Sequence, residues 1–335
     1  MIPMGIIRKI LSYFDIFTTG ILISLVLGII IPCHGAGAVF FDWLTNAAIV
    51  LLFFLYGVKL SRKSVVEGLL NWRLQSMVFA FTFVFFPVVI PLLRPLFEPM
   101  VGGALFMGLV YVACLPSTVQ SSIAFTSVAG GNVPAAVCSA SVSSLLGVFL
   151  TPFLVSLLFS TSGNTAHAQV GLDTVLKICY QILLPFIAGQ FSQPLLRKWV
   201  LGHKTLIGWN DKSTIWLVVY TAFSNATSGG YWSKLEATQL GGLVIACTCI
   251  LIITFAATWY SSRLLGFKRE DCITIVFCGS KKSLAVGAPM MLAIFGTLDN
   301  NLLLPLMVFH QVQLMLCAHL ARIWARGSAA DTGGY

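Results

Sequence analysis

Long uncharged stretches dominate this chain. No Asp, Glu, Lys or Arg occurs in the 74 residues from Pro99 to Leu172, and shorter uncharged runs lie on both sides of this stretch. Charged residues make up 9% of the 335 residues, compared with about 25% in an average soluble domain. In a lipid bilayer only helices and closed barrels satisfy every backbone hydrogen bond. Uncharged runs of this length therefore predict an all-α integral membrane protein.

The uncharged runs divide into ten segments that are long enough, or nearly so, to cross a bilayer as helices. They cover residues 16–32, 43–58, 74–93, 102–129, 133–159, 174–194, 213–229, 238–261, 272–298 and 300–321. Arg8 and Lys9 precede the first segment as in a signal peptide, but no A-x-A-like cleavage site follows it. We therefore predict ten transmembrane helices, the first of them at residues 16–32.

The basic residues are distributed unequally between the predicted loops. Of the 20 lysines and arginines, fifteen lie on the side of the two termini and three, Arg94, Lys177 and Lys234, lie on the opposite side. Cytoplasmic loops of membrane proteins carry an excess of Lys and Arg, so both termini are expected to be cytoplasmic. The net charge of +9 then reports orientation and not a nucleic-acid partner.

Lys281 and Lys282 are the two basic residues outside these loops. Nine uncharged residues precede them and sixteen follow, Ser283 to Leu298. Nine helical residues reach roughly 13 Å, about half of a ~30 Å hydrocarbon core. Ionisable residues at that depth mark functional sites. Lysines there can hold an anionic substrate, balance helix carbonyls in place of a bound cation, or carry a proton. The simpler alternative is a loop that exposes both lysines to cytoplasmic water.

Ten spans divide into five in residues 1–160 and five in residues 161–335. An odd number of helices in each half reverses the direction of the second half, which is the condition for inverted repeats. In such transporters the binding site lies where helices of both halves are interrupted. The fourth segment of each half is the irregular one in this sequence, and a simple proline kink is the alternative explanation for the first of them.

Polar residues gather at these two irregular segments. The predicted site comprises Pro116, Ser117, Thr118, Gln120, Ser121, Ser122, Ser139, Ser143, Ser280, Lys281, Lys282 and Ser283. Ser139 and Ser143 lie on segment five, whose small residues more simply predict close helix packing. The supporting residues are Thr82, Asn225, Gly287, Pro289, His310 and Gln311. Of these, His310 is expected to be a hydrogen-bonded structural histidine.

Ser280-Lys281 and Lys282-Ser283 also raise the hypothesis of a serine–lysine catalytic pair. Adjacent helical residues point about 100° apart, so neither pair is placed for proton transfer unless the segment is unwound. No separate oxyanion motif occurs, and we predict no enzymatic activity. The nine cysteines lack metal-ligand spacing and are expected to act as small hydrophobic residues.

These motifs resemble the sodium/bile acid symporter family, and more closely its branch of bile acid cotransporter 7-like proteins and their bacterial relatives. The resemblance covers nearly the whole chain. It is most specific at residues 277–284 (Phe-Cys-Gly-Ser-Lys-Lys-Ser-Leu), with Gly287 and Pro289, and at residues 115–122 (Leu-Pro-Ser-Thr-Val-Gln-Ser-Ser). It implies two inverted five-helix repeats, a panel domain and a core domain, with helices 4 and 9 broken and crossing. The implied activity is sodium-driven uptake of an organic anion by alternating access.

The residues that the resemblance would assign to sodium depart from the family pattern. Ser121 and Ser122 stand in place of a Ser-Asn pair, Thr82 stands in place of a glutamine, and Ala285 in place of a glutamate. The resemblance thus implies a possible Na⁺ site at Ser121 and Ser122 that lacks its glutamate. A proton carried by an intramembrane lysine is the alternative coupling ion.

The expected function is secondary active transport of a small organic anion in the plasma membrane, the inner membrane of a bacterium. The lipid bilayer and the substrate are the expected partners, no cofactor is expected beyond Na⁺ or H⁺, and the oligomeric state is left open. A regulatory membrane protein that binds a ligand without transporting it is the alternative from another class.

Overall fold

The computed structural model describes residues 16–59, 71–161, 184–230 and 235–332. Within these ranges the chain forms helices and short connections, without a β-strand. It divides into two compact units. Unit 1 comprises Met1–Lys59, Gln181–Leu235 and Leu298–Asn300, and unit 2 comprises Leu60–Tyr180, Glu236–Thr297 and Asn301–Tyr335. Each unit combines segments from both sequence halves, so the units differ from residues 1–160 and 161–335, whose inverted-repeat relation stays a prediction.

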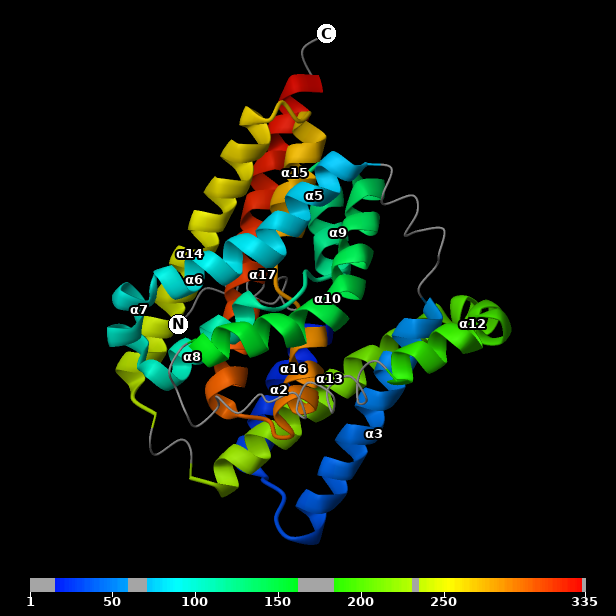
Figure 1. The fold of residues 1–335 in the computed structure, drawn as a ribbon, viewed down its shortest axis with the longest axis vertical. Helices are drawn as coiled ribbons and strands as arrows, with labels where there is room; N and C mark the ends of the chain where they lie inside the picture. Colours follow the sequence, from blue (N-terminus) through cyan, green and yellow to red (C-terminus); the bar gives the residue numbers. More distant parts are fainter. Residues whose placement is uncertain (1–15, 60–70, 162–183, 231–234, 333–335) are drawn as a thin grey trace, which may run out of the picture. The chain divides into compact units, whose positions relative to one another are not determined.

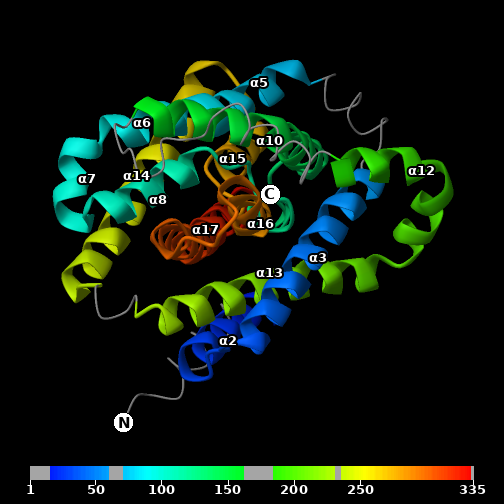
Figure 2. The same cartoon turned by 60° about the horizontal axis from the view of Figure 1, so that its bottom comes forward.

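Unit 1 is built from four helices, α2 (Ile16–Ile30), α3 (Ala36–Lys59), α12 (Leu184–Gly202) and α13 (Lys204–Ser228). Helix α12 packs along α3, and α13 packs against both α2 and α3 (Figures 1 and 2). Several helices of this unit extend beyond their predicted bounds. Helix α12 continues to Gly202 and α13 begins at Lys204, because a helix can extend beyond its apolar part. The predicted span 174–194 begins in residues that the structure does not describe.

Two glycines set the close contact between α3 and α12. A Cβ atom added to Gly57 would overlap the carbonyl oxygen of Phe186, and one added to Gly189 would overlap the carbonyl oxygen of Phe54. Small residues at facing positions allow helix backbones in a membrane to approach this closely, and the resulting van der Waals contact stabilises the pair.

We expect Gly57→Ala and Gly189→Ala each to destabilise the protein by about 1–3 kcal/mol, because overpacking forces the two backbones apart. Thermal unfolding in detergent measures the effect. Gly208→Ala is the matched control, since it lies on α13 with no atom within 4 Å of an added Cβ. The same loss of stability in all three variants would show that the contact is not the cause.

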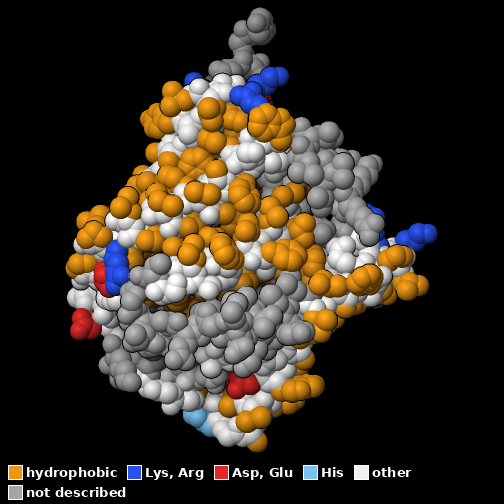
Figure 3. All heavy atoms as spheres, viewed as in Figure 1, with side chains coloured by type: hydrophobic (Ala, Val, Ile, Leu, Met, Phe, Trp, Pro, Cys, Tyr) orange, Lys and Arg blue, Asp and Glu red, His pale blue; other side chains and the backbone are white. Residues whose placement is uncertain are grey.

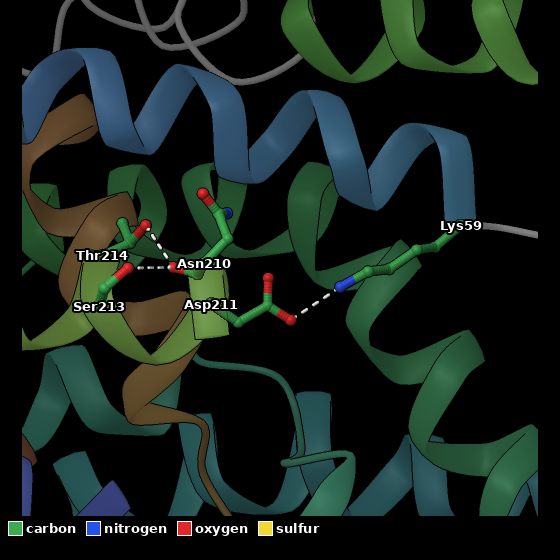
Figure 4. A network of polar contacts seen from close by, with 5 residues as sticks. All are labelled: Lys59, Asn210, Asp211, Ser213 and Thr214. Atoms are coloured by element: carbon green, nitrogen blue, oxygen red, sulfur yellow. Dashed lines mark hydrogen bonds and ion pairs between the residues drawn. The ribbon is translucent and has the colours of Figure 1, made fainter. Parts of the chain in front are cut away.

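An ion pair joins α3 to α13 at the end of α3 (Figure 4). The Lys59 ammonium donates to the Asp211 carboxylate at 2.7 Å, and the two side chains are 30% and 16% exposed. One turn further along α13, the hydroxyls of Ser213 and Thr214 donate to the carbonyl of Asn210. The pair explains how an acidic residue is tolerated on the inner face of a mostly apolar unit.

Unit 2 contains the remaining helices. Helices α5 (Trp72–Ala80) and α6 (Phe86–Leu92) are joined by a π-helical turn, Phe81–Phe85, and are followed by α7 (Arg94–Val101) and α8 (Gly103–Ala113). Next come α9 (Gln120–Val128), α10 (Val133–Thr161), α14 (Ala237–Leu264), α15 (Arg269–Gly279), α16 (Leu284–Phe295) and α17 (Asn300–Thr332). Helix α15 packs against α5, α9, α10 and α14, which places it in the interior of this unit (Figure 1).

Five helices of the described chain are long and apolar enough to cross a membrane: Ala36–Lys59, Trp72–Leu92, Val133–Ser160, Ala237–Leu264 and Asn300–Ala325. Shorter apolar helices cover Thr19–Ile30 and Gly103–Ala113. Large apolar side chains, such as Leu92, Phe153 and Ile252, are exposed along these helices, and Figure 3 shows apolar atoms spread over one face. The helices therefore present to their surroundings the surface that a bilayer requires, which confirms the membrane class.

Candidate functional site

Two segments of unit 2 are interrupted, as predicted. Helix α8 ends at Ala113 and α9 begins at Gln120, and helix α15 ends at Gly279 and α16 begins at Leu284. In the first break Pro116 has no N–H group, so the helical ladder cannot continue. In the second, the Ser283 hydroxyl accepts the N–H of Val286 and thereby caps α16. Both interruptions are thus determined by local sequence.

The two interruptions meet inside unit 2. The N–H of Ser283 donates to the carbonyl of Pro116 at 2.9 Å, and the Ser122 hydroxyl donates to the carbonyl of Phe277 at 3.0 Å. The Tyr111 hydroxyl donates to the carbonyl of Gly287 at 2.7 Å. Each bond joins the α8–α9 segment to the α15–α16 segment. We refer to this contact of residues 111–122 with residues 277–287 as the crossing.

The Lys282 ammonium is bound at the crossing by three backbone carbonyls. It donates to the carbonyl oxygens of Thr82, Ala113 and Leu115 at 2.7, 2.8 and 2.8 Å. An ammonium group has three donors, so its hydrogen-bonding capacity is filled. The nitrogen also lies 4.3 Å from the centre of the Phe86 ring, within cation–π distance. We call these three carbonyls and this ring the carbonyl cage.

Two prolines leave carbonyls of the cage without a helical partner. The N–H of Phe86, which would bond Thr82 in an α-helix, bonds Phe81 in the π-helical turn, and the following residue is Pro87. The carbonyl of Ala113 would accept the N–H of Ser117, but that group donates to the Ser143 hydroxyl. The other candidate donor to the Ala113 carbonyl is the residue three positions later, Pro116, which has no N–H. Lys282 therefore satisfies acceptors that the broken helices cannot satisfy themselves.

Side chains also pair three further backbone groups of the breaks. The Thr151 hydroxyl donates to the carbonyl of Cys114 at 2.8 Å. The amide of Gln313 accepts the N–H of Lys282 and donates to its carbonyl, both at 2.9 Å. Gln313 is fully buried on α17 and so takes the place of the helical neighbours that Lys282 lacks. The crossing is consequently an ordered polar network and not a disordered kink.

Lys281 has a different environment from its neighbour. Its side chain is fully buried, and its ammonium has no hydrogen-bond partner among the described residues. The nitrogen lies 4.1 Å from the ring centre of Phe125 and 5.5 Å from that of Phe277. Aromatic faces stabilise a cation by about 0.5–2 kcal/mol, much less than the cost of removing an unpaired charge from water. The ammonium is therefore under-satisfied, because it lacks the hydrogen bonds that a buried cation requires.

The hydroxyls of the first break are engaged with one another. Thr118 bonds Ser121 at 2.8 Å and Ser122 at 3.2 Å, and Ser122 also reaches the carbonyl of Phe277. Ser121 is half-buried, whereas Gln120 is exposed. Ser280 donates to the carbonyl of Val276, so neither it nor Ser283 bonds a lysine nitrogen in the structure. The segment is unwound, yet no serine–lysine pair is formed by these residues.

Helix α10 packs its small residues on both breaks. A Cβ added to Gly147 would lie 2.6 Å from the Pro116 ring, and Ala136 clusters with Ile275 and Cys278. This contact confirms the packing interpretation of segment five. Several hydroxyls on elements around the crossing are buried without a hydrogen-bond partner among the described residues: Ser117, Thr126, Ser139 and Ser144. Buried hydroxyls of this kind are available to a polar ligand.

The supporting residues separate into two groups. Gly287 and Pro289 lie on α16, where Gly287 accepts from Tyr111, and Thr82 contributes its carbonyl while its hydroxyl bonds Val78. Asn225 belongs to unit 1, where it is exposed and donates to Asp42 at 3.3 Å.

His310 is buried and bonds Gln313 at 3.0 Å, which confirms a hydrogen-bonded histidine. Gln311 is half-buried, and the glutamine that contacts the crossing is Gln313, which was not predicted. The ring contacts of Phe86, Phe125 and Phe277 were also missed. The available signal was the position of Gln313, three residues after His310 and on the same helix face.

Among the described residues, no group of three His, Cys, Asp or Glu side chains is placed to hold a metal ion. Apolar membrane-length helices, two crossing helix breaks and two buried lysines are features of membrane transport proteins. The chain belongs to the SBF-like CPA transporter family, whose profile matches residues 15–326.

Similar proteins come from bacteria and vertebrates. The chain is 46% identical to the putative symporter YfeH of Escherichia coli K12, over 95% of both chains. It is 51% identical to the uncharacterized protein PA2026 of Pseudomonas aeruginosa, over 93% of both chains. It is 28% identical to sodium/bile acid cotransporter 7 of Xenopus tropicalis, over 82% of this chain and 80% of that protein. These matches confirm the family resemblance and its cotransporter 7-like branch.

Proposed function

We propose that this protein is a secondary active transporter that moves a small organic anion across the bacterial inner membrane by alternating access. The single observation that carries the proposal is the Lys281 ammonium, which is fully buried at the crossing without a hydrogen-bond partner among the described residues. A buried cation of this kind is strongly stabilised by an anionic group that enters its site. The substrate anion is therefore proposed to bind at Lys281, with the unpaired hydroxyls of α10 and the first break as further donors.

The arrangement of the chain supports the architecture implied by the family. Spans one, two and seven and the described part of span six fall in unit 1, and spans three to five and eight to ten fall almost wholly in unit 2. We propose that unit 1 is the panel domain and unit 2 the core domain of two inverted five-helix repeats, with both termini cytoplasmic. The crossing of the fourth and ninth spans within unit 2 supports this assignment.

Sodium is the proposed coupling ion because the vertebrate relatives are named sodium/bile acid cotransporters. Ser121 and Ser122, with Thr118, are the hydroxyls proposed to receive it. The alternative is a proton carried by an intramembrane lysine, and the occupied carbonyl cage favours this alternative because the strongest group of acceptors is already taken. The titratable neighbours are Cys278 and Cys317 beside Lys281, and Cys114 beside Lys282.

Anion binding and ion coupling are tested on the purified wild-type protein. Thermal unfolding is measured with a bile acid anion, with smaller carboxylates, and with the uncharged methyl ester of each, in sodium or choline at fixed ionic strength. A ligand that binds the folded state raises its stability with occupancy. We expect one or more anions to stabilise the protein and their esters to have no effect.

Proteoliposomes then separate the coupling ions. Accumulation of the stabilising anion under an inward sodium gradient supports sodium symport, and accumulation under a pH gradient alone supports the lysine-coupled alternative. Stabilisation by an anion without accumulation under either gradient would identify a ligand-binding regulatory protein. Equal effects of acids and esters would contradict the assignment of Lys281 as the anion-binding group.

A further inference from the structure

The carbonyl cage has the composition of a monovalent cation site. Its ligands are three backbone oxygens from three separate places, the π-helical turn, the end of α8 and the first break, together with the face of Phe86. Rings of backbone carbonyls that replace a hydration shell are how proteins bind alkali ions. Prolines remove the helical partners of two of these oxygens, the carbonyls of Thr82 and Ala113. The broken backbone, and not the lysine, therefore leaves these two acceptors without helical partners.

The Lys282 ammonium occupies the centre of the carbonyl cage. The ammonium lies 2.7 to 2.8 Å from all three oxygens, the distance typical of charge-assisted hydrogen bonds. The backbone of Lys282 is held in place independently by Gln313, which pairs its N–H and its carbonyl. Position 282 is thus fixed at the second break while its side chain reaches across to the first. The lysine joins the two interrupted helices through a positive charge.

We infer that Lys282 is a tethered cation that permanently occupies a monovalent cation site, so that assembly of the crossing requires no sodium or potassium at this position. The inference rests on the proposed function only in treating the crossing as the transport site, and it deepens that function by assigning its ion chemistry. Sodium that drives transport must then bind elsewhere, such as at Ser121 and Ser122. Removing the tether should return the cage to ions from solution.

The Lys282→Ala variant tests the inference by thermal unfolding in sodium, potassium, ammonium, methylammonium or choline chloride at equal ionic strength. Alanine leaves the space of the lysine side chain beside three unpaired carbonyls. We expect the variant to unfold at a lower temperature than wild type in choline. A small cation at ten times its Kd should raise the unfolding midpoint of Lys282→Ala by roughly 2–4 °C. Choline is too large to enter and serves as the reference.

Lys281→Ala is the matched control, because its ammonium has no carbonyl ligands in the described structure. It should gain no cation response beyond that of wild type. Identical midpoints of Lys282→Ala in all five salts, or the same gain in Lys281→Ala, would overturn the inference. Because the measured quantity is stability, a protein that transports no anion would still show the cation response of Lys282→Ala. Failure of the proposed function is therefore distinguishable from failure of this inference.

Lys282→Gln decides the question if the alanine variant does not fold. Its amide offers two N–H donors to the cage but no charge. We expect this variant to unfold well below wild type, or not to be isolable, because an uncharged group cannot balance three converging oxygens. A wild-type midpoint for Lys282→Gln would show that the cage needs donors and no cation, and would overturn the inference.

Discussion

The two adjacent lysines should respond in opposite directions to the same substitution. We expect Lys281→Met to raise the thermal stability of the ligand-free protein and Lys282→Met to lower it. Replacing a buried ion pair by apolar side chains of similar volume is often neutral or stabilising by about 1–4 kcal/mol, and a buried charge without a partner is more unfavourable, at about 3–5 kcal/mol. Lys281 is such a charge, since its ammonium has no hydrogen-bond partner in the described structure. The Lys282 ammonium is bonded to three carbonyls. Its loss leaves three buried acceptors unpaired, at about 1–3 kcal/mol each.

Lys281→Met should weaken anion binding although it raises the stability of the ligand-free protein. Removing one partner of a buried charge pair weakens binding by about 2–5 kcal/mol, or roughly 30- to 5,000-fold in Kd. Lys281→Met is therefore expected to be a more stable protein that has lost most of its affinity for the stabilising anion. Thermal unfolding with and without that anion measures both quantities in one experiment.

Lys281→Arg is the control that keeps the charge while changing the shape of the group. It should retain part of the anion response that Lys281→Met loses. A fall in stability for both methionine variants would show that Lys281 has a partner in the folded protein. Full anion affinity in a well-folded Lys281→Met variant would exclude this lysine as the binding group.

Gln313→Leu is expected to destabilise unit 2 by about 2–6 kcal/mol. The Gln313 amide pairs both the N–H and the carbonyl of Lys282 at 2.9 Å, and both groups are buried at the second break. Leucine has a similar size but no polar atoms, so two buried backbone groups lose their partners at about 1–3 kcal/mol each. Thermal unfolding measures the loss, and reduced transport should accompany it because position 282 is no longer held.

Gln311→Leu is the matched control on the same helix, two residues away and half-buried. It should change stability by less than about 0.5 kcal/mol, as is usual for substitutions away from buried networks. Gln313→Glu adds a second comparison, because a carboxylate accepts the N–H but does not donate to the carbonyl. Equal effects at positions 311 and 313 would refute the specific role of Gln313.

Local sequence was sufficient to predict the membrane class and the positions of the helix breaks. Charge-free runs of membrane length predicted the class of protein, and the basic residues of the loops predicted an orientation. Pro116 and the cluster Gly279–Ser283 predicted where two helices break, because a missing N–H or a flexible glycine acts within one turn of the chain. The structure places a helix break at both positions.

The different environments of Lys281 and Lys282 were decided by tertiary structure alone. Lys281 and Lys282 share the same neighbouring sequence and the same expected depth in the membrane, so no sequence pattern distinguishes their roles. What distinguishes them is which distant atoms they meet: carbonyls of residues 82, 113 and 115 for one, and the rings of Phe125 and Phe277 for the other. Gln313 was missed for the same reason, since its partner lies 31 residues away.

By itself the sequence determined an all-helical membrane protein with two polar irregular segments and a lysine pair within an apolar stretch, because length, apolarity and proline act locally. Tertiary structure decided that the breaks cross, that π-helical geometry turns the Thr82 carbonyl toward Lys282, and that Lys281 is left without a hydrogen bond among the described residues. These outcomes depend on the convergence of groups from four separate segments, and such convergence is a property of the packed chain.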